Sequence, residues 1–142
     1  MSIPDSSLME KPPAVHHAQL ALWLWTIWVS LYGIYDTNRS GPELIDFVNT
    51  NIEGYTITGH QILMGAIIGY SALALVSAFV IYKIGKGKNW ARASLVAGFL
   101  LQLAMLAMPP YNIADLPDIG LQVYALILLY SAPARAWFNA HK

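Results

Sequence analysis

Four polar side chains that interrupt long apolar stretches are the best candidates for chemistry in this sequence. They are Ser30, Gln102, Gln122 and Tyr124. Counted along helices, Gln102 lies about 9 Å and Ser30 about 8 Å from the same end of a bundle. The four could line a small pocket that opens outward beneath residues 40–53, or they could hydrogen-bond across helices at about 0.6–2 kcal/mol per contact. The sequence favours the second interpretation.

A second chemical feature is the basic stretch at residues 83–92, which holds no acid. Its basic residues are Lys83, Lys86, Lys88 and Arg92. Two glycines lie among them, but a turn between two apolar runs lacks the strand and helix that a phosphate-binding loop joins. We therefore expect these side chains to contact anionic lipid headgroups, each worth about 1 kcal/mol.

The residue types used in catalysis and metal binding do not form a set. Cysteine is absent, and the four histidines are His16, His17, His60 and His141. No two of them are placed at similar depth on different helices, as haem requires, and neighbours on a helix point about 100° apart, which disfavours zinc. No charge lies inside the long apolar runs, which argues against a proton pump or voltage sensor. We expect no enzyme activity, no metal and no cofactor.

Composition places the chain in the membrane class. It has 142 residues, of which 56% are hydrophobic and 11% are charged, whereas soluble domains carry about 25% charged residues. The net charge is zero, so nucleic acid is not an expected partner. We expect an all-α, integral membrane four-helix bundle over residues 16–138, between a mobile tail (1–15) and a short tail (139–142). The predicted spans are 18–35, 60–82, 90–108 and 118–138.

The distribution of Lys and Arg predicts the orientation of this bundle. With both termini and the 83–92 turn on the cytoplasmic side, seven of the eight basic residues are inside and only Arg39 is outside. The seven inside are Lys11, Lys83, Lys86, Lys88, Arg92, Arg135 and Lys142. We therefore expect a multi-pass membrane protein with both termini in the cytoplasm.

The acidic connection at residues 36–58 is the longest polar segment between spans. Ser40 and Glu43 have the spacing of a capping box, which predicts a short amphipathic helix at 42–51 in the first extracytoplasmic loop. The residues expected to bind a partner are Glu43, Leu44, Asp46, Phe47 and Val48. The alternative is a loop whose apolar face rests on the membrane surface. Thr58 and Gln61 repeat the capping-box pattern where the second span opens.

Two motifs in the C-terminal half carry a resemblance. Gly-Lys-Asn-Trp-Ala-Arg ends at Arg92, and Ser-Ala-Pro-Ala-Arg-Ala-Trp-Phe ends at Phe138. The chain resembles small uncharacterised bacterial inner-membrane proteins with four spans, a Lys-Asn-Trp-Ala-Arg turn and a C-terminal Ala-Trp-Phe. The resemblance implies architecture and location, and it implies no activity.

Three functions remain open on the sequence alone. The first is non-catalytic binding of another membrane protein, as an accessory or stabilising subunit. The second is an immunity protein that blocks a membrane-acting toxin. The third is an oligomeric channel or small-solute transporter that uses the polar cluster. The expected partners are therefore membrane lipid and either another membrane protein or a second copy.

Overall fold

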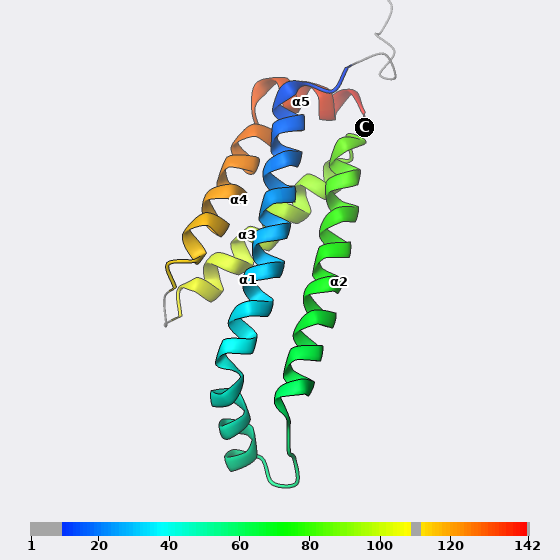
Figure 1. The fold of residues 1–142 in the computed structure, drawn as a ribbon. Helices are drawn as coiled ribbons and strands as arrows, with labels where there is room; N and C mark the ends of the chain where they lie inside the picture. Colours follow the sequence, from blue (N-terminus) through cyan, green and yellow to red (C-terminus); the bar gives the residue numbers. More distant parts are fainter. Residues whose placement is uncertain (1–9, 109–111, 142) are drawn as a thin grey trace, which may run out of the picture. The chain divides into compact units, whose positions relative to one another are not determined.

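The computed structural model describes residues 10–108 and 112–141 (Figure 1). This part of the chain contains helices and no strand, which confirms the all-α prediction. The helices are α1 (Pro13–Asn51), α2 (Gly59–Gly85), α3 (Asn89–Leu106), α4 (Asp115–Leu129) and α5 (Ala132–Ala140). Three segments lie outside the described residues: most of the predicted mobile tail (1–9), residues 109–111 with the Pro109-Pro110 pair, and Lys142.

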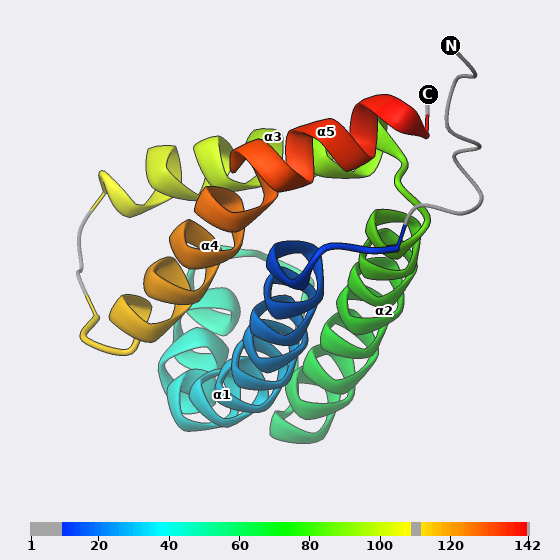
Figure 2. The ribbon, with the colours of Figure 1, turned by 90° about the horizontal axis from the view of Figure 1, so that it is seen from above.

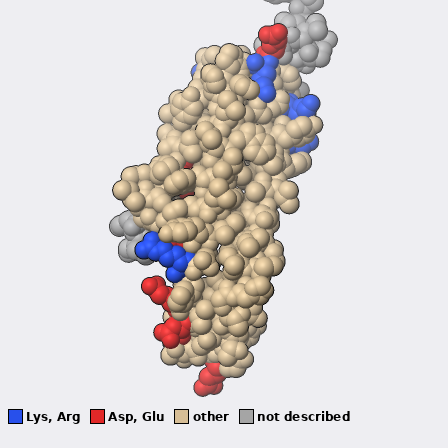
Figure 3. Space-filling model, in the orientation of Figure 1, with Lys and Arg blue, Asp and Glu red and all other residues tan. Residues whose placement is uncertain are grey.

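Among the described residues, one helix, or two segments if a bent pair of helices counts as one span, is long and apolar enough to cross a membrane. The first is α2, with 27 residues. The second is α4 together with α5, if these two helices form one span that is bent by 64°. On the face drawn in Figure 3, uncharged residues cover most of the surface, and Lys, Arg, Asp and Glu are few.

The chain divides into two compact units, which are described separately. Unit 1 contains residues up to Trp25 and from Ala78 onward, and unit 2 contains Thr26–Ser77. In unit 1, α3 packs against α4 and α4 against α5, and Figure 2 shows α5 turning away from the direction of α4.

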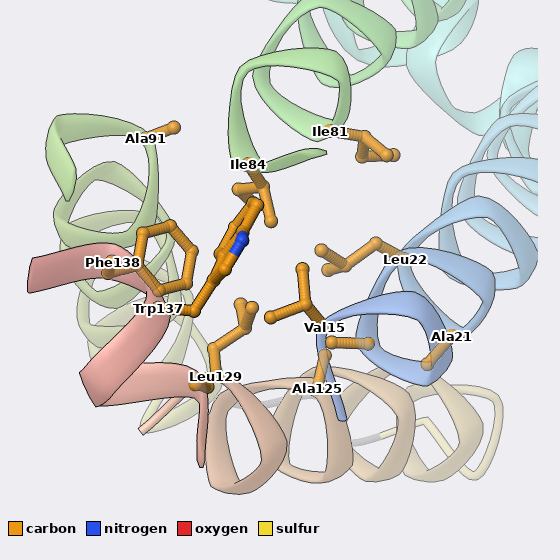
Figure 4. Close-up of a cluster of buried hydrophobic side chains, with 12 residues drawn as sticks. Val15, Ala21, Leu22, Ile81, Ile84, Ala91, Ala125, Leu129, Trp137 and Phe138 are labelled. Atoms are coloured by element: carbon orange, nitrogen blue, oxygen red, sulfur yellow. The ribbon is translucent and has the colours of Figure 1, made fainter. Parts of the chain in front are cut away.

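The core of unit 1 collects side chains from all five helices (Figure 4). Leu22 comes from α1, Ile84 from α2 and Leu129 from α4. Helix α5 contributes Trp137 and Phe138; in Figure 4 Trp137 lies beside Ile84, and Phe138 lies beyond it toward α3. Ala134, three and four positions before these two residues, is on the same face of α5 and is also buried.

Helix α1 is longer than predicted at both ends. It begins at Pro13, a position where a missing N–H costs nothing, and Val15, expected in the tail, is fully buried. It also runs through Pro42, so the separate amphipathic helix predicted at 42–51 is wrong, and those residues are the end of α1. Pro42 cannot bond to the carbonyl of Asn38, but Asn38 is exposed and water can take its place.

In unit 2, the two helices approach each other at a glycine. A Cβ atom added at Gly33 would overlap the ring of Tyr70, so only glycine lets this ring rest on the α1 backbone. At Gly65 and Gly69, in contrast, an added Cβ atom would meet no described atom within 4 Å. The close contact between helices therefore lies at Gly33.

Both ends of α2 are closed by local hydrogen bonds. Thr58 Oγ1 accepts from Gln61 N at 3.3 Å and Gln61 Oε1 accepts from Thr58 N at 3.0 Å, which confirms the predicted capping box. At the other end, Lys88 N donates to the Lys83 carbonyl at 3.1 Å and Gly87 N to the Ile84 carbonyl at 3.0 Å. This is a Schellman motif, and Gly87 supplies the φ of +75° that it needs.

Candidate functional site

A hydrogen-bonded cluster around one carboxylate is the main polar feature of unit 1. Asp118, in the first turn of α4, accepts from Gln102 Nε2 on Oδ2 at 2.5 Å. Its Oδ1 accepts from Gln122 Nε2 at 2.8 Å and also from the indole N–H of Trp25. Gln122 donates in addition to Gln102 Oε1. One acid thereby joins α1, α3 and α4, and we call these four residues the Asp118 network.

The network contains two of the four polar residues singled out from sequence. Gln102 and Gln122 meet, whereas Tyr124 is 50% exposed, on the side of α4 away from buried Gln122. Ser30 belongs to unit 2, and its buried hydroxyl has no hydrogen-bond partner among the described residues. Sequence reasoning missed Asp118 as a member, although it precedes Gln122 by four residues and so shares its helix face.

The residues of the Asp118 network lie at similar distances from the helix ends that meet in unit 1. Trp25 is twelve residues from the start of α1, Gln102 thirteen from the start of α3, and Asp118 eleven from the end of α4. At 1.5 Å per residue, these counts give about 16–20 Å from the ends that meet in unit 1. The network therefore forms one layer across the three helices.

The basic stretch separates into surface lysines and one internal arginine. Lys86 and Lys88 are exposed, and Lys83 is half-buried. The Lys83 ammonium lies 5.3 Å from the centre of the Phe79 ring and 5.8 Å from that of Tyr82. These three lysines remain available to a membrane surface.

Arg92, which the sequence assigned to headgroup contact, is buried in the protein instead. It is only 7% exposed, and its guanidinium lies 4.4 Å from the centre of the Tyr130 ring and 4.5 Å from that of Phe138. Its Nη1 donates to the Leu129 carbonyl at 3.1 Å. The two motifs that carried the resemblance are therefore in direct contact.

Pro133 explains why Arg92 is needed at this place. The residue four positions after Leu129 is Pro133, which has no N–H to donate to the Leu129 carbonyl. Arg92 supplies the missing donor. The predicted span 118–138 accordingly breaks into α4 and α5, with a 64° bend. The sequence predicted a distorted last turn, and the structure has a separate helix.

The residues predicted to bind a partner lie near the end of α1 in unit 2. Glu43 and Asp46 are exposed, Leu44 is 44% exposed and Phe47 is 61% exposed. Val48 is half-buried. Helical spacing puts Leu44 and Phe47 on one stripe, with the two acids beside Phe47. An apolar pair with an acidic flank is thus presented away from the core.

The described part of the chain offers no evident metal site, because it contains no group of three His, Asp or Glu that could hold an ion. His141 is used locally: its Nδ1 lies 2.8 Å from the Trp137 carbonyl, and its ring packs on the Trp137 ring. Comparisons with protein-family models, with curated proteins and with solved structures give no match.

Proposed function

We propose that the chain is a four-span protein of the bacterial inner membrane with both termini in the cytoplasm. The support is the exposure of α2, of whose most apolar 18-residue stretch only 11% is buried. A surface of this kind is stable in lipid and costly in water. In α1 and α3, Trp, Tyr and Gln lower the hydropathy, but these residues suit membrane interfaces and contacts between membrane helices.

Reporter fusions test this topology. A reporter that is active only outside the cytoplasm should be active when inserted at Gly54, in the connection after α1, and inactive at Gly87. A fluorescent protein that folds only in the cytoplasm should give the opposite pattern at these two sites. Activity of the first reporter at Gly87 would overturn the orientation.

The proposed role of this protein is to bind another membrane protein without catalysis, as an accessory or stabilising subunit. The observation that carries the proposal is the exposed pair Leu44 and Phe47 beside Glu43 and Asp46. Large exposed apolar residues next to charged ones are typical of interaction surfaces. The acids disfavour the alternative that this stripe rests on anionic lipid, because like charges repel.

The test is affinity purification from the native host in mild detergent, comparing Phe47→Ala with Thr50→Ala. Thr50 is an exposed residue on the same helix and serves as the matched control. A stoichiometric partner that is retained by Thr50→Ala and lost by Phe47→Ala supports the proposal. The absence of any stoichiometric partner from the wild-type protein overturns it. If the partner is a toxin that the protein neutralises in cells, the role is that of an immunity protein.

A second candidate function, passage of a small solute, is favoured by Asp118 alone. An ionisable group inside a bundle of membrane helices is commonly functional, and no Lys or Arg in the described residues pairs with this carboxylate. In liposomes, Asp118→Asn and Gln102→Leu should lower solute flux, while Asp115→Asn in the same first turn should not. Equal flux in the wild-type protein and the three variants would show that the network has a structural role only.

A further inference from the structure

Two lysines of the α2 terminus converge on a single aromatic ring. The Lys83 ammonium lies 5.8 Å from the centre of Tyr82, and the Lys86 ammonium lies 5.5 Å from the same centre. The Schellman motif that follows fixes the backbone of this turn, and it brings a third lysine, Lys88, to its surface. Three positive charges therefore gather within one tight turn.

These charges have no internal counter-charge. Among the described residues, no carboxylate forms an ion pair with Lys83, Lys86 or Lys88, and Arg92, the nearest further cation in the turn, is turned into the core. Like charges close together raise the energy of the folded state unless an anion lies between them. An anion that is not part of the chain would therefore bind favourably at this turn.

The surface beside the lysines is apolar. Phe79 is 53% exposed and Trp90 is 47% exposed, and their rings lie 6.0 Å apart, one from α2 and one from α3. Lys83 lies over Phe79 at 5.3 Å, so the cationic and aromatic groups are continuous. A ligand that matches both parts has an anionic head and a hydrocarbon tail.

We propose that this surface, formed by Phe79, Tyr82, Lys83, Lys86 and Trp90, is a binding site for an anionic phospholipid. The phosphate would lie between Lys83 and Lys86, and the first methylenes of an acyl chain would pack on Phe79 and Trp90. The headgroup carries no ammonium, because a second cation beside the phosphate would be repelled by the lysines. The site therefore prefers phosphatidylglycerol-type lipid to phosphatidylcholine or phosphatidylethanolamine.

The test uses the full chain, purified in mild detergent and mixed with defined lipids, with retained lipid counted by native mass spectrometry. Two basic residues near a charged headgroup predict about thirtyfold preference for phosphatidylglycerol over phosphatidylcholine. The Lys83→Gln/Lys86→Gln double variant should lose most of this preference, and Tyr82→Leu should reduce it. Arg135→Gln, which removes an exposed cation on α5, should retain it.

Three results would overturn the proposal. The first is equal retention of phosphatidylglycerol and phosphatidylcholine by the wild-type protein. The second is the same loss of preference in the Arg135→Gln control as in the double lysine variant. The third is full displacement of the lipid by millimolar inorganic phosphate, since that would indicate an ion site without contact to the acyl chain. Thermal unfolding without lipid confirms that each variant is folded.

Discussion

Replacing Arg92 with Met should destabilise the protein by about 2.5–5 kcal/mol. Met keeps most of the side-chain volume but cannot donate to the Leu129 carbonyl, which Pro133 also leaves without a donor. A hydrogen bond from a charged group contributes about 1.5–3 kcal/mol. The two aromatic rings that contact the guanidinium add about 0.5–1 kcal/mol each.

A double-mutant cycle separates this contact from general packing. In Pro133→Ala, residue 133 regains an N–H, so α4 can continue through Ser131 and bring this N–H to the Leu129 carbonyl. Arg92→Met should therefore cost about 1–2 kcal/mol less in that background. The assay is the free energy of unfolding from denaturant titration in detergent, followed by far-ultraviolet circular dichroism. Arg135→Met, on the exposed face of α5, is the control and should change stability by less than about 0.5 kcal/mol. An Arg92→Met cost that is the same in both backgrounds would refute the reasoning.

Three further substitutions test other contacts by the same unfolding measurement. Asp118→Leu should lower the unfolding free energy by about 1–3 kcal/mol because it leaves the amide donors of Gln102 and Gln122 unpaired. Asp115→Leu is the control and should cost clearly less; equal losses would contradict a special role for the network. Gly33→Ala should cost about 1–3 kcal/mol by displacing the ring that rests on it, whereas Gly65→Ala, which meets no atom within 4 Å, should be neutral or stabilising. Thr58→Ala should cost about 1 kcal/mol through loss of the capping box, and an unchanged α2 stability would show that the cap contributes nothing.

The sequence predicted helix ends well where the hydrogen bonds that form them join residues close together in the chain. The Thr58 capping box and the tight turn at Gly87 are formed within a few residues, so their chemistry can be read along the chain. The sequence predicted that the first span ends at 35 and that a separate helix begins at 42, because polar residues and Pro42 lie between them. An exposed helix tolerates polar residues and a proline, since water can bond to the carbonyl that the proline leaves free, and α1 continues to Asn51.

The site was harder to predict because it depends on contacts between distant segments. Gln102 and Gln122 stood out as polar residues in apolar runs, but Asp118 looked like an interfacial acid at the start of a span. Only the packing of α1 shows that Asp118 lies opposite Trp25. Arg92 was misassigned for the same reason: its partners Leu129 and Phe138 are far along the chain, and a basic turn by itself predicts exposure.

The contact of Arg92 also sets an order of assembly. The arginine is synthesised 37 residues before Leu129, so when α3 is complete its guanidinium has only the side chain of Asn89, three residues away, as a partner. Its remaining contacts form only after the chain has bent at Ser131 and α5 has brought Phe138 against it. This end of unit 1 is thus closed by the last of the described helices to be synthesised.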